Sequence, residues 1–428
     1  MNGYDGVAVL TGTGTAAGTG TAPPGADRPR VLFVDDDPQM LAGLRRMLRS
    51  HRDAWDMAFA ESAAQALAIL ATGPYDAVVS DYRMPGMDGG ALLEVIRGRY
   101  PYTARLILSG HTNEDDLIKV VLLAHQFIPK PCQPDELLGA LERVLGPRRE
   151  LARRDLRREL VGIDTLPSVP HTLIELLALL ESPDASPSGV AEVLVRDPAA
   201  TAKVLHVVNS AGAGTRHRIS NVAQAVTLLG MRNVRALVLL YDLVHDFNRT
   251  RTIPSDWVAR LTRHCVQTSR LARALSAGTG WAEEAFTAGL LLEIGQLVVA
   301  ACRPRQFEVH QHTWAGTGGA LRPLELLTFG TDHAAIGAHL LGLWGLPADI
   351  GEAVAAHTTA VPPGRPADLA GTVALAHALA EARCGALCGR YDGVPAVADS
   401  QLDPDVLDRV ALWRAACPTG PDLREEQP

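Results

Sequence analysis

Lysine is scarce in this chain. Only three of its 40 basic residues are lysines, namely Lys119, Lys130 and Lys203. The net charge is −8 and the isoelectric point is near 6.0. Contacts with nucleic-acid phosphates need clustered Lys and Arg, so this charge balance argues against a nucleic-acid partner. Lys130 is notable because it is a lysine in a chain whose basic residues are almost all arginine.

Cysteine motifs and long uninterrupted apolar runs are also missing. The six cysteines are scattered and form no C-x2-C pair, so they suggest neither a zinc knuckle nor a disulfide framework. The longest apolar stretch, 286–301, is interrupted by Glu293 and Gln296, and the N-terminus has no basic, apolar leader. We therefore expect no membrane association and a cytoplasmic location.

The composition that is present indicates a globular protein with terminal extensions. Hydrophobic residues make up 47% and charged residues 21% of the 428-residue chain. Residues 1–29 are rich in Gly, Thr, Ala and Pro, and we expect them to be disordered. A charged segment at 147–160 predicts a helical connector, with a dimer seam left open. Residues 418–428 are expected to form a flexible tail.

The region 30–146 alternates short apolar runs with amphipathic stretches. This alternation predicts an α/β fold, a doubly wound parallel sheet of five strands with helices on both faces. The expected strands are 30–34, 56–59, 76–80, 104–108 and 126–129. The expected helices are 38–49, 61–71, 89–98, 113–123 and 134–146.

Four of the predicted strands end in polar side chains. These are Asp35, Asp36 and Asp37 after the first strand, Asp81 after the third, Ser109 after the fourth and Lys130 after the fifth. The carboxyl ends of parallel strands meet at one edge of a sheet, so these groups should converge. Carboxylates suit a hard cation such as Mg²⁺, and an ammonium and a hydroxyl suit phosphoryl oxygens. The pattern predicts phosphoryl transfer to a carboxylate. Helix capping alone could explain Asp37 but not the other strand ends.

The motifs VLFVDDDP, VVSDYRMPGMDG, LILSGH and FIPKP resemble the receiver domain of two-component response regulators along the whole of 30–146. The resemblance implies that a sensor histidine kinase phosphorylates Asp81. It also implies a cis peptide bond between Lys130 and Pro131. The other site roles that it implies are Mg²⁺ binding by Asp35, Asp36, Asp81 and the backbone carbonyl of Arg83, phosphoryl binding by Ser109 and Lys130, and a switch role for the aromatic ring of Phe127.

Residues 161–417 have a helical pattern throughout and predict an all-α domain. The stretches LPSVPHTLIELLALLESPDAS and VRDPAATAKVLHVVNSA, with Asp197-Pro198 and Asn209-Ser210, resemble the HDOD domain. That domain is a helical relative of the HD-type metal phosphohydrolases, and the likeness covers roughly 160–380. Asn209-Ser210 could contact a ligand, although such residues more often buttress a helix junction.

Active HD enzymes bind metal through a histidine, an adjacent His-Asp pair and a later aspartate. On this resemblance His264 occupies the first position, but the pair is replaced by Leu292-Glu293 and the late aspartate by His377. Leucine offers no lone pair to a metal, so we expect the HD-type metal site to be lost and the domain to have no catalytic residues. We expect His333, His339, His357 and His377 to be packed or exposed helix residues.

Three functions follow from these observations. The favoured one is a phosphorylation-dependent regulator whose helical domain acts through contacts with a downstream protein. A receiver-gated, metal-dependent phosphohydrolase or cyclic-nucleotide phosphodiesterase is the alternative, which the changed pair disfavours. A DNA-binding output through 203–235 is the third, which the apolar run LVLL disfavours.

Overall fold

The computed structural model describes most of both predicted domains. The ranges it describes are 28–110, 123–145, 185–210, 218–231, 254–317, 321–358, 366–384 and 399–416, with scattered positions between 172 and 182 and at 234. The predicted disordered segment (apart from its last two residues), the charged connector and the C-terminal tail therefore lie outside the described residues.

The first domain is built on a five-stranded sheet in the order β2-β1-β3-β4-β5, in which all neighbouring strands are parallel. The strands are β1 (Arg30–Val34), β2 (Asp56–Ala60), β3 (Ala77–Asp81), β4 (Ala104–Ser109) and β5 (Gln126–Pro129). The helices are α1 (Pro38–Met47), a 3-10 turn η1 (Leu48–His51), α2 (Ala63–Leu70), α3 (Gly89–Arg99) and α5 (Pro134–Leu145). The predicted α/β fold is confirmed; the helix expected at 113–123 falls almost wholly outside the described residues.

Helices cover both faces of this sheet because its strands are apolar on both sides. Successive strand residues point to opposite faces. Val31 and Phe33 of β1 therefore pack with α1 and α5, whereas Leu32 and Val34 pack with α2 and α3. Asp37 caps α1 by accepting a hydrogen bond from the backbone N–H of Gln39, as expected.

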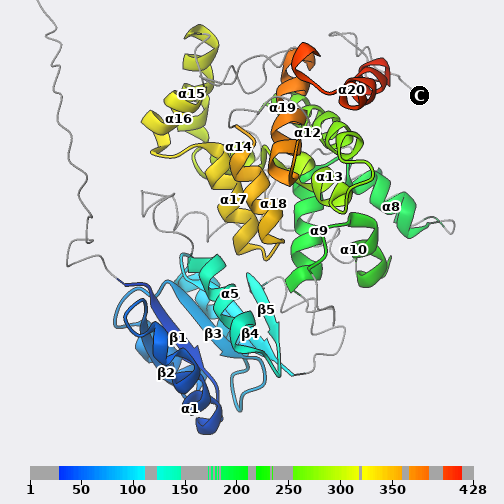
Figure 1. Cartoon of the computed structure of the whole chain (residues 1–428). Coiled ribbons are helices and arrows are strands. Elements are labelled where there is room, and N and C mark those ends of the chain that lie inside the picture. The colour runs from blue at the N-terminus through cyan, green and yellow to red at the C-terminus, as the bar shows by residue number, and fades with distance from the viewer. Residues whose placement is uncertain are drawn as a thin grey trace, which may run out of the picture.

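The second domain is all-α in the residues described (Figure 1). Its N-terminal helices are α8 (Pro187–Leu194), α9 (Pro198–Ser210), α10 (Val222–Leu229), α12 (Ser255–Leu275), α13 (Ala282–Leu291) and α14 (Ile294–Cys302). They are followed by α15 (Pro304–Thr317), α16 (Leu321–Phe329), α17 (His333–Leu343), α18 (Ala348–Ala356), α19 (Leu369–Cys384), a 3-10 turn η3 (Asp399–Gln401) and α20 (Pro404–Ala416).

Among the described residues, the stretch Ala282–Cys302 is long and apolar enough to cross a membrane by length and composition. In the folded domain 89% of its best window is buried. The stretch is also divided into α13 and α14, with Leu292 and Glu293 between them. It is therefore a core element of the helical domain.

The two domains share an interface at the β5–α5 side of the sheet. Figure 1 shows α5 and β5 facing the helical domain, and α17 contacts α5 while α9 contacts β5. The buried Gln126 amide of β5 donates to the backbone carbonyls of Gly342 (3.1 Å) and Leu343 (3.4 Å) at the end of α17. Its oxygen accepts from Arg143 of α5 at 3.3 Å.

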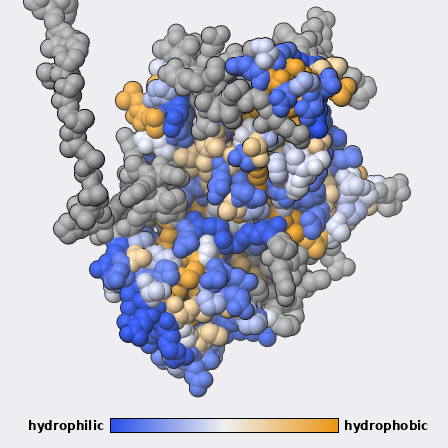
Figure 2. Space-filling view, viewed as in Figure 1, coloured by the Kyte–Doolittle hydropathy of each residue, from blue (hydrophilic) through white to orange (hydrophobic). Residues whose placement is uncertain are grey.

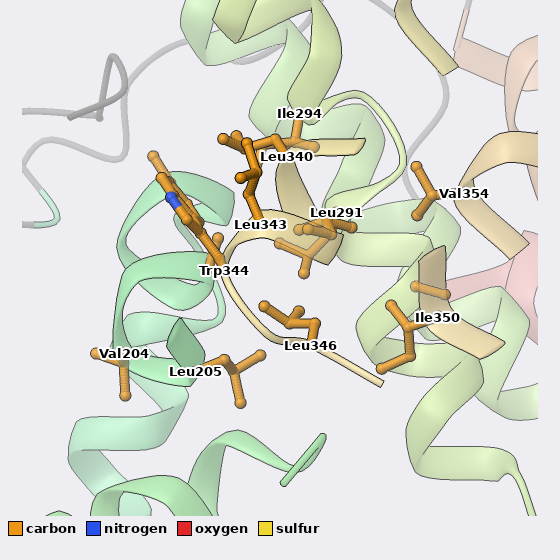
Figure 3. Close-up of a cluster of buried hydrophobic side chains, with 14 of the residues drawn as sticks. Val204, Leu205, Leu291, Ile294, Leu340, Leu343, Trp344, Leu346, Ile350 and Val354 are labelled. Carbon is orange, nitrogen blue, oxygen red and sulfur yellow. The ribbon is translucent and has the colours of Figure 1, made fainter. Parts of the chain in front are cut away.

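Apolar packing continues inward from this interface. Figure 3 shows Val204 and Leu205 of α9 near Trp344 and Leu346, which follow α17, and Leu291 beside Leu340. All of these side chains belong to one buried cluster that also includes sheet residues of the first domain. A rearrangement of β5 or α5 would therefore meet closely packed atoms of the helical domain.

Candidate functional site

The carboxyl edge of the sheet brings together the side chains predicted from the sequence. Oxygens of Asp35, Asp36 and Asp81 lie within 4.8 Å of one another. Asp35 and Asp81 are buried, and Asp36 is exposed at the rim. They converge because β1 and β3 are adjacent parallel strands that end at the same edge.

Lys130 reaches this acidic group from the end of β5. Its ammonium lies 2.6 Å from Oδ1 of Asp81 and 2.8 Å from Oδ2 of Asp35. The peptide bond between Lys130 and Pro131 is cis, as expected. Lys130, one of the few lysines of the chain, thus contacts both buried carboxylates.

Burial and neighbouring charges act in opposite directions on the pKa values of this pair. Burial raises the pKa of Asp81, Lys130 opposes this effect, and the result is still above the ordinary value. Burial by itself lowers the pKa of Lys130, but its hydrogen bonds to Asp35 and Asp81 outweigh burial and raise it. Lys130 is therefore held in the charged form that can pair with an anion.

Three further predicted residues lie on β4 and β5 or just after β3. The backbone N–H of Arg83 donates to Oδ2 of Asp81 at 3.2 Å, which places its peptide beside the carboxylate. The hydroxyl of Ser109 is buried and makes no hydrogen bond to any described residue. Phe127 is 8% exposed and packs on the sheet face opposite to that of Ile128. Ser109 thus offers a donor at the same edge as Lys130.

The donor set at this edge fits a hard divalent cation. Mg²⁺ takes oxygen ligands and is usually held by one or two carboxylates, with waters and phosphate oxygens completing its shell. Two buried carboxylates and one exposed carboxylate provide that arrangement. Residues expected to hold the ion are Asp35, Asp36, Asp81 and the carbonyl of Arg83.

A second group of ionisable side chains lies inside the helical domain around Glu293, which is fully buried. Four histidines from separate elements approach its carboxylate: His264 of α12, His333 of α17, His357 after α18 and His377 of α19. Their Nε2 atoms lie 4.0, 3.2, 3.6 and 3.4 Å from a Glu293 oxygen, in that order. We call these five residues the Glu293 cluster.

The charges in the Glu293 cluster compensate one another. Burial raises the pKa of Glu293, but His333 and the other imidazoles outweigh burial and hold this pKa well below its ordinary value. Burial lowers the pKa of His333, but Glu325 and Glu293 outweigh burial and raise it to about 9. Burial lowers the pKa of His264 to about 3. The cluster therefore combines a charged His333 with a neutral His264.

His333, His357 and His377 are packed residues, as expected, but the sequence did not indicate that they converge on Glu293. The four histidines lie far apart in the sequence, on or next to four different helices, and no spacing or periodicity indicates that they converge. The sequence did contain one signal of such a cluster. Glu293 lies within the apolar run 286–301, and a carboxylate needs charged or hydrogen-bonding partners when that run is buried. Leu292 is itself buried, and Glu293 beside it is the centre of the group.

Of the two roles considered for Asn209, ligand contact and support of a helix junction, the structure shows the second. Its amide donates to the carbonyls of Leu205 and Ile219, and its oxygen accepts from the N–H of Ile219. These bonds join the end of α9 to the segment before α10. Asn209 therefore buttresses a helix junction.

Two protein families account for most of the chain. The response regulator receiver domain matches residues 31–142, and the HDOD domain matches residues 166–360. The HDOD domain is related to the HD domain and is generally non-catalytic.

Similar curated proteins match mainly over the first domain. The hydrogenase transcriptional regulatory protein HoxA of Cupriavidus necator is 34% identical over 29% of this chain and 27% of its own length. The DNA-binding transcriptional regulator NtrC of Escherichia coli K12 is 34% identical over 28% of this chain and 25% of its own length. An uncharacterised protein of Treponema pallidum is 27% identical over 43% of this chain and 36% of its own length. The chain thus spans only about a quarter to a third of these relatives.

Similar solved structures include the MmoQ response regulator of Methylococcus capsulatus Bath. It is 25% identical, covers 58% of this chain and 98% of that chain, and has a TM-score of 0.46. The signal receiver domain of an HD domain-containing protein from Pseudomonas fluorescens Pf-5 is 34% identical over 28% of this chain and 95% of that chain, with a TM-score of 0.27.

Proposed function

The chain belongs to the response regulators that join a receiver domain to an HDOD domain, and on that basis we propose that phosphorylation of Asp81 switches an output made by protein contacts. A sensor histidine kinase is the phosphoryl donor. The observation that carries the proposal is the contact of Lys130 with Asp81 and Asp35, at the edge where the buried Ser109 hydroxyl has no hydrogen-bond partner among the described residues.

The chemistry proposed at Asp81 is a transfer between two protein side chains. A carboxylate oxygen of Asp81 attacks the phosphorus of a phosphohistidine on the kinase, the bond from nitrogen to phosphorus breaks, and the imidazole leaves with the electron pair. The Lys130 ammonium and the Ser109 hydroxyl bind the oxygens of the new acyl phosphate. A bound Mg²⁺ ion would supply positive charge beside these oxygens.

Transmission to the helical domain is proposed to pass along β5. Lys130 directly follows β5, and its ammonium would exchange a carboxylate partner for a phosphoryl oxygen. The hydroxyl of Ser109 would gain a phosphoryl oxygen as a partner. Phe127 and Gln126 precede Lys130 on β5, and Gln126 is hydrogen bonded to the end of α17. A shift of this strand would alter the interface, because packed elements rearrange as units.

The output is proposed to be non-catalytic and cytoplasmic, with residues 30–146 as the receiver, 147–160 as a connector and 161–417 as the output domain. The HDOD domain is generally non-catalytic, and Leu292-Glu293 stands where the resemblance to HD enzymes expects a His-Asp pair; both points support a non-catalytic output. Exposed apolar side chains on the α15–α16 hairpin also support protein contact: Val309, Leu326 and Leu327 are 66%, 45% and 79% exposed. Figure 2 shows hydrophobic side chains gathered over that hairpin. The proposal includes a downstream signalling protein that binds the helical domain, and a homodimer formed through the connector.

Two assays on the full chain separate this function from a phosphohydrolase. With a phosphodonor and Mg²⁺, wild type should capture a different set of cell proteins from Asp81→Asn. Identical sets would contradict the proposal. Hydrolysis of cyclic nucleotides or bis(p-nitrophenyl) phosphate should be absent with Mg²⁺ or Mn²⁺. Turnover that disappears in Glu293→Gln would establish the enzymatic alternative.

The contact of Gln126 with α17 gives a prediction about coupling. Gln126→Ala leaves one half-buried carbonyl, one buried carbonyl and Arg143 without this partner, so we expect a loss of about 1–3 kcal/mol in unfolding free energy. Calorimetry should show the two domains unfolding in better separated transitions. Gln39→Ala on the exposed face of α1 is the control and should change neither stability nor cooperativity. An unaltered calorimetric profile in Gln126→Ala would count against a coupled interface.

A further inference from the structure

The centre of the helical domain holds a carboxylate that water does not reach. Glu293 and His264 are both 0% exposed, and His357 and His377 are 1% and 3% exposed. A buried carboxylate is costly unless positive charge or several hydrogen bonds surround it. Part of this requirement is met on the Oε2 side, where Gln296 donates at 2.8 Å and His333 lies 3.2 Å away.

The other oxygen of Glu293 faces imidazole nitrogens at a spacing that an ion could occupy. Nε2 of His377, His357 and His264 lie 3.4, 3.6 and 4.0 Å from Oε1. Two ligands held at about 2.0–2.1 Å from a tetrahedral zinc ion are separated by roughly 3.3 Å. Glu293, His357 and His377 also offer ligand atoms that all lie within 4.8 Å of one another. Small side-chain movements would bring these three residues onto one ion, and His264 lies in a second such group, with His377 and Glu381, that shares His377.

His357 is oriented as metal-bound histidines usually are. Its Nδ1 lies 2.6 Å from the backbone carbonyl of Val354, to which a protonated Nδ1 donates. In the neutral ring this leaves the lone pair on Nε2, which lies 3.6 Å from Oε1 of Glu293 and 3.2 Å from Nε2 of His333. Bonds of this kind from the outer nitrogen fix the tautomer and the ring plane of metal ligands.

His264 supplies an independent observation. It is fully buried on α12, and neither ring nitrogen makes a hydrogen bond in the described structure. A buried imidazole without hydrogen bonds is costly, so it calls for a missing partner. Its Nε2 lies 4.0 Å from both Oε1 of Glu293 and Oε1 of Glu381.

We propose that the helical domain binds one divalent transition-metal ion of the zinc class through Glu293, His357, His377 and His264. Three imidazoles and one carboxylate form a borderline donor set that favours zinc over magnesium or calcium. The site is closed by burial and has four protein ligands, which is typical of structural rather than catalytic zinc. Glu381, one turn after His377 on α19, lies at the edge of the site. The ion would tie α12, α18 and α19 to the junction between α13 and α14.

The test uses the full chain, stripped with a chelator and then exposed to Zn²⁺ in excess Mg²⁺, which occupies the receiver site. After desalting, elemental analysis should give about one zinc per chain, and the midpoint of thermal unfolding should rise. His377→Gln and His264→Gln should each weaken zinc binding by more than the roughly 10–100-fold expected for an outer-shell change. His310→Gln is the matched control, because the ring of His310 is also buried and has no hydrogen bond to a described residue; this variant should bind zinc normally.

If the histidine variants fail to fold, the proposal can still be tested on wild type, which is loaded with Co²⁺ in place of Zn²⁺. Visible ligand-field bands of a four-coordinate nitrogen and oxygen site are then expected, and Zn²⁺ should displace them. The proposal is overturned if folded wild type retains no zinc and shows no such bands. It is also overturned if folded His377→Gln and His264→Gln bind as tightly as wild type. Neither result bears on phosphorylation of Asp81.

Discussion

Replacing Asp81 with asparagine should abolish phosphorylation of the chain. Wild type incubated with acetyl phosphate and Mg²⁺ should gain one phosphoryl group, measured by intact mass. Asp81→Asn should gain none, because the amide cannot replace the carboxylate as the attacking group, although its size is nearly unchanged. Borohydride reduction followed by peptide mapping should place the acyl phosphate of wild type at residue 81.

Asp53→Asn is the matched control for this experiment. Asp53 is exposed in the turn before β2, and its replacement removes the same charge outside the acidic edge. This variant should be phosphorylated like wild type. Equal labelling of Asp81→Asn and wild type would show that another residue accepts the phosphoryl group, and the proposed site would be wrong.

The second large effect is expected at Gly295, where α14 crosses α17. A Cβ atom at this position would lie 1.9 Å from the carbonyl oxygen of His333 and 2.9 Å from the backbone nitrogen of Gly337. Backbone atoms cannot move aside as a flexible side chain can. Gly295→Ala should therefore destabilise the helical domain by about 3 kcal/mol or more, despite the better helix propensity of alanine. Chemical denaturation followed by circular dichroism measures the change.

Gly351→Ala on α18 provides the comparison within the same domain. The nearest atom to its added Cβ would be the carbonyl oxygen of Ala338, at an ordinary contact distance of 3.8 Å. Alanine should stabilise that helix by about 0.5–1 kcal/mol relative to glycine. If Gly295→Ala were as stable as Gly351→Ala, the close crossing of α14 and α17 would be refuted.

The fold of the first domain was predictable because its signals are local. Apolar runs such as VLFV and AVVS set the strands, and Asp37 with Pro38 marks the start of α1. Parallel strands then bring their carboxyl ends to one edge, so the meeting of Asp35, Asp81 and Lys130 followed from strand order alone.

The Glu293 cluster was not predictable by the same reasoning. Helical periodicity identifies buried faces, but it does not say which faces meet across a bundle of many helices. The resemblance to HD enzymes aligns Leu292 with a metal-binding histidine, but it does not indicate that Glu293 has four histidines around it. The contact of Gln126 with α17 was hidden for a similar reason, since a glutamine on an edge strand gives no sequence signal of a partner more than 200 residues away.

Hydrogen exchange at the end of α17 tests most directly whether modification of Asp81 is felt by the helical domain. Full-length protein is compared with and without beryllofluoride and Mg²⁺, which mimic the phosphorylated state. We expect protection of the amides at residues 342–346 to change in wild type but not in Asp81→Asn. Unchanged protection in wild type with the mimic bound at Asp81 would contradict transmission through β5 and Gln126.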